Sequence, residues 1–352
     1  MLRLLLVPAM ISVLFAGCSS QEEDDLGPLL LHYEGDVPGA AVLVVQGGEV
    51  VLSRTVGLAD VEAKRAVTEN TNFRLASVTK QFTAAAILRL VEAGSLLLTE
   101  SLTDVFPDFP SYGSKITVRH LLTHTSGLVS YEGLIPDTAT IQVYDADVLE
   151  MMKEQTATYF EPGTEYRYSN TGYAILAMIV EARSGRTFSE FAREEIFEPA
   201  GMTGTVAFRA GENTVENRAM GYRVDGSQIV PADQSLTSAV LGDGGVYSSI
   251  ADLKAWDEAL DENLVLTEEM IELATTPIAL EDGTQVGYGF GWRIDEYWGR
   301  RRIHHTGSTS GFRTVIKKFP DDRFTVVVLT NRRDPSVSDL ADKLVDLYLL
   351  RD

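Results

Sequence analysis

Three short motifs contain residues that can carry out acyl transfer. Ser77 precedes Lys80 by three positions, which places a hydroxyl and an amine on one helical face, one turn apart. Tyr168-Ser169-Asn170 and His305-Thr306-Gly307 follow far downstream, in that order. A serine hydroxyl is a poor nucleophile until a neighbouring base accepts its proton, and a lysine can be that base. The ordered set predicts a serine hydrolase that places lysine, not histidine, beside its nucleophile.

The two residues of the first motif also have ordinary structural interpretations. Ser77 precedes a predicted helix over Val78–Ala93 and could cap it, the commonest role of a serine at such a place. Lys80 could face solvent. The helix is rich in alanine and nearly uncharged, however, which predicts that it is covered on most sides. Burial would favour the neutral amine, the form that accepts a proton.

Several further segments extend the pattern. Together they resemble the serine β-lactamase and penicillin-binding-protein superfamily, and within it the class C β-lactamase-like branch. That branch also holds esterases, D-amino-acid peptidases and D,D-carboxypeptidases. The resemblance runs from about Pro38 to Asn331 and includes Phe73-Arg74-Leu75-Ala76-Ser77, Leu121-Leu122-Thr123-His124-Thr125-Ser126-Gly127-Leu128, Phe160-Glu161-Pro162-Gly163, Gly244-Gly245-Val246-Tyr247-Ser248, Tyr288-Gly289-Phe290-Gly291-Trp292 and Leu329-Thr330-Asn331.

The resemblance implies a role for each residue of the set. Ser77 would form the acyl-enzyme, with Lys80 and Tyr168 as general base and acid. Asn170 would hold Lys80 and the substrate amide, although it could instead be the N-cap of a helix over Thr171–Ser184. The remaining substrate-binding and oxyanion positions are His305, Thr306, Gly307 and Ser308, with the backbone N–H of Ser308 as the second oxyanion donor.

His305 departs from the usual β-lactamase pattern, which has lysine at this place. Histidine has an ordinary pKa of about 6.5 and is mostly neutral at neutral pH, so it offers a substrate carboxylate no permanent cation. We therefore expect poor β-lactam hydrolysis, with small esters or D-amino-acid and cell-wall peptides as substrates. His305-Thr306-Gly307 is expected to start or lie along a strand edge that lines the cleft. His304 would then point to the other face of that strand and is expected to pack there.

Other chemistries are disfavoured. His120 and His124 have the i, i+4 spacing of a zinc pair, but no glutamate follows His120, so no metal is expected. The chain has no Gly-x-Ser-x-Gly elbow, which argues against an α/β-hydrolase. Gly242–Gly245 lacks the lysine of a phosphate loop and is expected to be a turn lining the cleft. No cofactor is expected.

Strand-like and helix-like patterns are segregated along the chain. Strands are predicted near both ends, including a hairpin through Gly47-Gly48 and a strand over Gly287–Ile294. Helical patterns dominate the middle. This order predicts an α/β (α+β) fold, with one antiparallel sheet built from both chain ends and flanked by helices. The sheet lobe is expected over about 29–99 and 276–352, beside a mainly helical lobe over about 100–275.

The N-terminus predicts export. Arg3 is followed by an apolar run from Leu4 to Ala16, too short to span a bilayer, so residues 1–17 are expected to be a signal peptide. The small pair before Cys18 resembles a lipobox, which implies lipid anchoring at Cys18; ordinary secretion is the alternative. Residues 18–28 would be a tether before a domain over 29–352. We expect a bacterial cell-envelope location, facing the periplasm or exterior.

The net charge of −21 argues against a nucleic-acid partner, because phosphates would be repelled. The expected partners are a small ester or peptide substrate and, through Cys18, a membrane. One alternative function remains open: a penicillin-binding or regulatory sensor that keeps the fold and turns over little. The intact motif set favours the enzyme.

Overall fold

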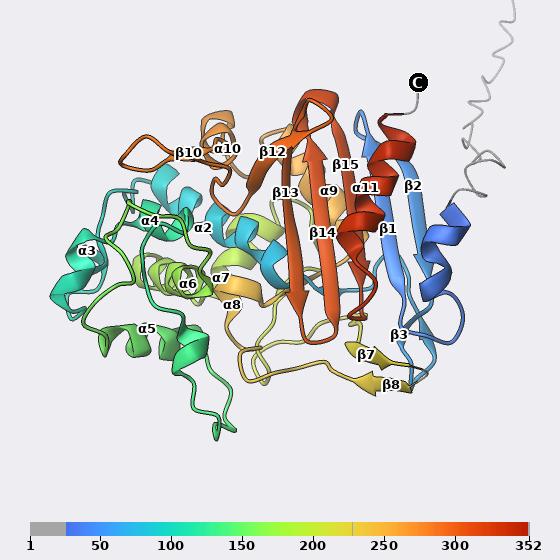
Figure 1. Ribbon diagram of the computed structural model, residues 1–352, viewed down its shortest axis with the longest axis horizontal. Helices are drawn as coiled ribbons and strands as arrows, with labels where there is room; N and C mark the ends of the chain where they lie inside the picture. Colours follow the sequence, from blue (N-terminus) through green and yellow to red (C-terminus); the bar gives the residue numbers. More distant parts are fainter. Residues whose placement is uncertain (1–25, 227, 351–352) are drawn as a thin grey trace, which may run out of the picture.

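A computed structural model describes residues 26–226 and 228–350 (Figure 1). Its main feature is a six-stranded sheet in the order β12-β13-β14-β15-β1-β2, with every neighbouring pair antiparallel. Strands β1 and β2 come from the N-terminal part of the chain and the other four from the C-terminal part, as the sequence predicted. The bounds are β1 Ala40–Gln46, β2 Glu49–Val56, β12 Arg293–Tyr297, β13 Arg300–Thr309, β14 Phe312–Phe319 and β15 Phe324–Thr330.

Inside the sheet, the N-terminal strand β1 pairs with the C-terminal strand β15. This pair runs in register from Ala40 opposite Thr330 to Gln46 opposite Phe324. Both strands are almost entirely buried, because helices cover both faces of the sheet. α11 (Val337–Tyr348) packs on one face and α9 (Ile250–Asp261) on the other. Two-sided burial explains why these strands consist mainly of aliphatic residues without a polar alternation.

The helices from the middle of the chain lie beside the sheet (Figure 1). α2 and α6 pack against each other at the centre of this region, and most of their residues are buried. The bounds are α2 Lys80–Glu92, α3 Leu102–Val105, α4 Val118–Leu122, α5 Asp145–Lys153, α6 Asn170–Ser184, α7 Phe188–Ala192, α8 Leu241–Gly244 and α10 Glu268–Ala274. The short strands are β3 Leu58–Asp60, β4 Arg65–Ala66, β5 Phe73–Arg74, β6 Val206–Ala207, β7 Tyr222–Asp225, β8 Gln228–Pro231, β9 Val246–Ser248, β10 Ile278–Ala279 and β11 Gln285–Val286.

The predicted strand over Gly287–Ile294 is wrong for most of its length. Only Arg293 and Ile294 belong to a strand, the start of β12, and the preceding residues form bends and one isolated bridge. Its glycines are needed for close packing, not for strand pairing. A Cβ on Gly291, whose φ is +79°, would lie 2.7 Å from both the Gln81 Cα and the Lys80 carbonyl oxygen. The segment therefore lies directly against α2.

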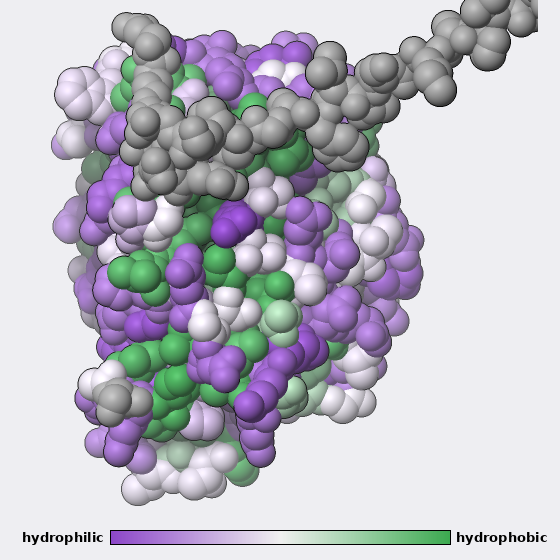
Figure 2. Space-filling model, turned by 90° about the vertical axis from the view of Figure 1, so that its right-hand side faces the viewer, coloured by the Kyte–Doolittle hydropathy of each residue, from purple (hydrophilic) through white to green (hydrophobic). Residues whose placement is uncertain are grey.

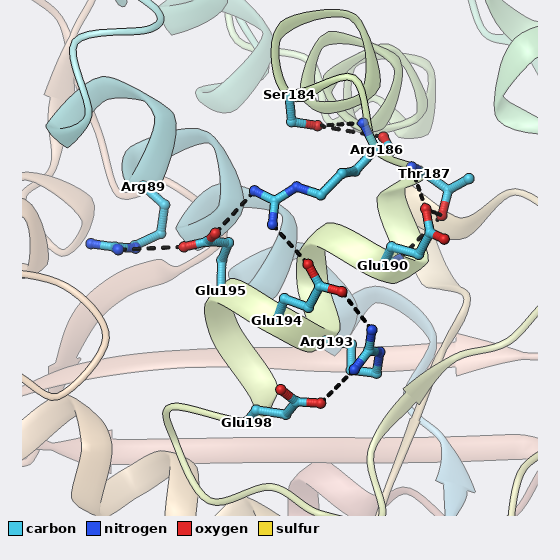
Figure 3. A network of polar contacts seen from close by, with 9 residues as sticks. All are labelled: Arg89, Ser184, Arg186, Thr187, Glu190, Arg193, Glu194, Glu195 and Glu198. Carbon is cyan, nitrogen blue, oxygen red and sulfur yellow. Dashed lines mark hydrogen bonds and ion pairs between the residues drawn. The ribbon is translucent and has the colours of Figure 1, made fainter.

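Much of the charge on the surface is organised in local ion pairs. Figure 3 shows Arg186 bridging Glu194 and Glu195 of the π-helical turn η5 (Arg193–Phe197), with Glu195 also contacting Arg89 of α2.

The side of the molecule beyond the edge strand β2 has a mixed surface. Figure 2 shows hydrophobic and hydrophilic side chains side by side on this face. Val50 and Val51 of β2 are exposed.

The expected signal peptide and Cys18 lie outside the described residues. Within residues 26–226 and 228–350, no helix is long and apolar enough to cross a bilayer.

Candidate active site

Ser77 and Lys80 lie where a short 3₁₀ turn, η2 (Ala76–Thr79), leads into α2. The Lys80 Nζ is 3.3 Å from the Ser77 Oγ. Lys80 is fully buried, whereas Ser77 is half-buried. The capping alternative for Ser77 is wrong, because the residues preceding η2 and α2 are Leu75 and Thr79 and neither has a side-chain cap. The solvent-facing alternative for Lys80 is wrong as well.

Asn170 is one of three groups that hold the Lys80 amine. The Lys80 Nζ donates to the Asn170 Oδ1 at 2.8 Å and to the Asp243 carbonyl oxygen at 2.8 Å, besides its contact with Ser77. The N-cap of α6 is Ser169, whose hydroxyl accepts from the Gly172 N–H. The capping alternative for Asn170 is therefore wrong, since its side chain is turned towards Lys80.

Tyr168 also borders the amine. The Lys80 Nζ lies 5.1 Å from the centroid of the Tyr168 ring. In the described part of the chain, the Tyr168 hydroxyl is buried and has no hydrogen-bond partner. Buried hydroxyls are nearly always paired, so an unpaired one beside a buried lysine suggests a functional position.

The segment His305–Ser308 lies on β13, as predicted. Its pairing with β14 continues through His305 opposite Ile316 to Thr309 opposite Phe312, whereas its pairing with β12 ends at His304. The edge from His305 onward therefore faces the turn η2.

Close backbone approach fixes this edge against the turn that carries Ser77. A Cβ on Gly307 would lie 2.0 Å from the Leu75 carbonyl oxygen, so no other residue fits there without a shift. The Thr314 hydroxyl donates to the same oxygen at 2.7 Å. Thr306 is half-buried beside Gly307, and Ser308 is exposed.

His305 is buried in the site and neutral. Its Nδ1 donates to the Thr306 carbonyl oxygen at 2.8 Å, which leaves Nε2 to accept from the Tyr288 hydroxyl at 3.1 Å. Burial, with the Lys80 charge as the second cause, holds the pKa of His305 well below its ordinary value. His304 points to the other face and contacts Asp295 at 3.3 Å; burial lowers the pKa of His304 to about 4.

The His124 ring packs against the tyrosines of the site. Its ring centroid lies 4.3 Å from that of Tyr168 and 4.5 Å from that of Tyr288, and its Nδ1 accepts from the Ser169 N–H at 3.1 Å. His120 is used locally, accepting from the Thr117 N–H. Across residues 26–226 and 228–350, no group of three or more His, Cys, Asp or Glu is placed to hold a metal ion.

Three charged residues of the site were missed by sequence reasoning. The Glu132 Oε1 accepts from the Asn170 Nδ2 at 2.7 Å, and the Asp243 Oδ2 accepts from the Tyr131 hydroxyl at 2.9 Å. The Arg293 guanidinium lies 5.4 Å from the Tyr168 ring centroid. Asp243 belongs to the Gly242–Gly245 segment that was expected to be a turn lining the cleft. In the structure Gly242, Asp243 and Gly244 instead belong to the short helix α8 (Leu241–Gly244), although the segment does border the site through the Asp243 carbonyl. Glu132 and Arg293 carry no motif that would single them out.

Comparison with known proteins gives a consistent picture. The family model described as Beta-lactamase matches residues 21–350. Penicillin-binding protein 4* of Bacillus subtilis is 35% identical over 309 residues, covering 83% of this chain and 68% of the relative. The D-aminopeptidase of Brucella canis is 31% identical over 324 residues, covering 90% of this chain and 60% of the relative. The chain thus spans about two thirds or less of the length of these relatives.

Solved structures share the fold. The octameric penicillin-binding protein homologue from Pyrococcus abyssi aligns with a TM-score of 0.80 and 28% identity, covering 95% of this chain and 77% of the other. The D-amino acid amidase from Ochrobactrum anthropi SV3 aligns with a TM-score of 0.78 at 22% identity, covering 93% and 99%. With the family model matching nearly the whole described chain, this protein belongs to the β-lactamase family.

Proposed function

We propose that the protein is a serine hydrolase that cleaves an ester or amide bond through an acyl-enzyme on Ser77. The observation that carries the proposal is the line of polar contacts from Ser77 Oγ to Lys80 Nζ to Asn170 Oδ1, inside a site open at Ser77 and buried at Lys80. The relatives named as D-aminopeptidase and penicillin-binding protein support a hydrolase acting on amides or peptides.

The hydrogen bonds of Lys80 suggest how it acts as a base. A neutral amine has two N–H groups and one lone pair. Its two shorter contacts, 2.8 Å each, go to the carbonyl oxygens of Asn170 and Asp243, which can only accept. The lone pair is then left for the Ser77 hydroxyl at 3.3 Å. After proton transfer, the ammonium donates to all three oxygens, so the site accommodates both protonation states without rearrangement.

The developing oxyanion would be held by two backbone N–H groups. That of Ser77 lies in the first turn of its helical segment, where N–H groups have no partner within the helix. That of Ser308 would come from β13, which Gly307 allows to approach Leu75 closely. Loss of one such donor typically costs about 2.7–4 kcal/mol of transition-state stabilisation.

Tyr168 would transfer protons to the leaving group and then activate the deacylating water. Its ring centroid lies 5.1 Å from the Lys80 Nζ, so the phenol borders the amine with which it would exchange protons. The neutral His305 supports small esters or D-amino-acid and cell-wall peptides as substrates, with slow β-lactam hydrolysis. Thr306 and Asn170 would contact the substrate.

The decisive experiment is active-site labelling. A fluorophosphonate or a fluorescent penicillin should modify Ser77, identified by peptide mass spectrometry, and S77A should remain unmodified. Turnover of p-nitrophenyl esters and D-amino-acid amides should fall at least about 10³-fold in S77A. A folded wild-type protein that is never labelled at Ser77 contradicts the proposal. Labelling followed by a burst without steady turnover supports the sensor alternative instead.

We also propose export and lipid anchoring at Cys18. Metabolic labelling with a fatty-acid analogue in a bacterial host should mark the wild type but not C18S; equal labelling of both contradicts the anchor.

A further inference from the structure

We propose that His124 is the positioning residue of Tyr168: it holds the phenol in place for the proton transfers of the reaction and touches neither the substrate nor Ser77. This inference rests on the proposed function, and it adds a residue on which the proton transfers depend.

The backbone of Tyr168 lies outside the regular elements. α6 begins at Asn170 and its N-cap is Ser169, so the helix holds Asn170 whereas Tyr168 precedes it. The Tyr168 hydroxyl is buried and has no hydrogen-bond partner in the described chain. Neither α6 nor a hydrogen bond of the hydroxyl therefore sets the direction of this side chain.

Two hydrogen bonds to His124 fix the backbone on either side of Tyr168. The His124 carbonyl oxygen accepts from the Arg167 N–H at 2.9 Å, and its Nδ1 accepts from the Ser169 N–H at 3.1 Å. The His124 ring also packs on the Tyr168 ring, with the two centroids 4.3 Å apart and the ring planes inclined by 40°. One residue thus contacts the chain before and after the phenol, and the phenol ring itself.

An uncommon backbone conformation accompanies these contacts. The φ of His124 is +59°, in the left-handed region that residues other than glycine seldom adopt. The adjacent residue anchors this conformation: the Thr125 N–H donates to the His120 carbonyl oxygen at 2.9 Å, and the Thr125 carbonyl oxygen accepts from the Gly163 N–H at 2.8 Å. Residues held in such strained conformations concentrate at functional sites. The strain at His124 is therefore of the kind expected for a residue that serves the site.

His124 is not placed to carry protons itself. Because Nδ1 accepts a hydrogen bond, the proton of the neutral ring is on Nε2 and no lone pair is free. Burial, with the Lys80 charge as the second cause, holds the pKa of His124 well below its ordinary value. The ring therefore supports Tyr168 as a neutral group, and the transferred proton belongs to the phenol.

Separate measurements of acylation and deacylation test this proposal. The p-nitrophenolate ion is a stable leaving group, so acylation of Ser77 by p-nitrophenyl acetate needs no acid, whereas deacylation needs the water that Tyr168 would activate. The burst of p-nitrophenolate measures acylation, and intact-protein mass spectrometry measures loss of the acetyl group. In H124A, deacylation should slow about 10- to 100-fold, as expected for a displaced proton-transfer group. Acylation should change by less than about threefold, since Ser77 and Lys80 keep their contacts.

The sharpest comparison places H124A in the Tyr168→Phe background. A residue that acts only through the phenol has nothing left to position there, so H124A/Y168F should deacylate at the rate of Y168F within about twofold. Losses that multiply in the double variant would show that His124 acts on the reaction by another route, and they overturn the proposal.

H124N is the conservative variant. Asparagine tolerates the left-handed conformation, and its Oδ1 can accept from the Ser169 N–H, although the ring is lost. H124N should therefore deacylate about 3- to 10-fold more slowly than the wild type, at a rate between the wild type and H124A. It gives the same comparison with Tyr168→Phe should H124A not fold.

H120A is the matched control. The His120 Nδ1 also accepts from a backbone N–H, that of Thr117, and in the described part of the chain no contact joins it to Tyr168. Both rates should match those of the wild type within about twofold.

The two proposals fail in different ways. Equal slowing of acylation and deacylation in H124A, or deacylation at the wild-type rate in both His124 variants, overturns this inference; wild-type labelling and turnover then leave the proposed hydrolase intact. A wild type that is never acylated at Ser77, or is acylated without turnover, overturns both.

Discussion

At the scale of single residues, the site depends on a lysine whose polar partners are all uncharged. Lys80 is surrounded by a hydroxyl, a side-chain amide and a backbone carbonyl, and His305 nearby is neutral because burial lowers its pKa. The carboxylate of Asp243 accepts from Tyr131 and that of Glu132 from Asn170, so neither contacts the amine directly, although the Lys80 charge lowers the pKa of Asp243 against the larger effect of burial. Such an arrangement lets a proton move between Ser77 and Lys80 without a strong ion pair trapping it on the amine.

Tyr168→Phe tests the role of the phenol. The substitution should lower kcat about 10²- to 10⁴-fold, the range expected for loss of a general acid or base. Because the hydroxyl has no hydrogen-bond partner in the described chain, the free energy of unfolding should hardly change. Steady-state ester hydrolysis measures kcat, and urea denaturation measures the free energy of unfolding.

Tyr33→Phe is the matched control for that substitution. Tyr33 also has a buried hydroxyl without a partner in the described residues, but it belongs to the core on the α11 side of the sheet. The kcat of the Tyr33→Phe variant should equal that of the wild type. A Tyr168→Phe variant that retains full kcat would rule out a proton-transfer role for this phenol.

The residues of the site differ in how far sequence alone could identify them. Ser77, Lys80, Asn170 and His305 stand in motifs whose spacing is local, and the structure brings them together around one amine or along one strand edge. Glu132 enters from a loop, and nothing in its neighbours predicts that it reaches Asn170. Only tertiary packing decides such contacts, so they could not be derived from spacing.

At the scale of elements, the short helix α8 holds Lys80 through the Asp243 carbonyl oxygen. Its backbone N–H groups at Leu241 and Gly242 donate to the Asp145 carboxylate at 2.8 and 3.0 Å, and the Gly242 carbonyl accepts from Thr83 of α2. The carbonyl of Asp243 is thereby aimed at Lys80. Three elements, α2, α5 and α8, set the position of one oxygen.

The Asp243 side chain makes the stability of this arrangement depend on pH. Burial is the main cause that raises the pKa of Asp243 from 3.8 to about 6. Between these values the native state binds more protons than the unfolded chain, so the contribution of this group to stability falls as pH rises. The Asn side chain of an Asp243→Asn variant cannot ionise. The free energy of unfolding of this variant relative to that of the wild type should therefore rise by roughly 2–3 kcal/mol between pH 4 and pH 8.

Chemical denaturation of both proteins at the two pH values measures this difference. The Asn side chain can still accept from Tyr131, so the comparison isolates the charge. A difference that is the same at both pH values would show that Asp243 does not titrate in this window.

Elements were predicted best where a long apolar or amphipathic pattern is bounded by turn residues. The sequence pattern predicts strands over Ala40–Val45, Phe312–Phe319 and Arg323–Thr330 and a helix over Ser338–Leu350. These segments agree within a few residues with β1, β14, β15 and α11. The segment before β12 was misjudged because aromatic residues alternating with glycine look like a strand. In the structure, those glycines allow the backbone to contact α2, an interaction that depends on a distant element.

At the scale of the whole molecule, a buried ion pair joins the sheet to the helix that covers it. Lys318 of β14 contacts Asp257 at 2.7 Å and Asp261 at 2.6 Å, both on α9, and Thr325 of β15 also donates to Asp257. Lys318 and Asp257 are nearly inaccessible. The pair therefore connects residues from the C-terminal strands with a helix from the middle of the chain.

Lys318→Met should destabilise the fold by about 3–5 kcal/mol, because it leaves Asp257 buried without its cation. Lys115→Met is the control, since Lys115 forms an exposed pair with Glu161 and should cost at most about 1 kcal/mol. Thermal or urea unfolding compares the two. Equal effects would mean that the buried pair contributes no more than a surface one.

The pairing of β1 with β15 has a consequence for synthesis on the ribosome. The first strand is made early, yet its partner strand, which includes Thr330, is made long after it. Gly307, which sets the distance between β13 and the turn bearing Ser77, also arrives late. A nascent chain therefore contains Ser77 long before it contains the strand that would complete the proposed oxyanion site, and chemical competence is expected only after β13 has been made.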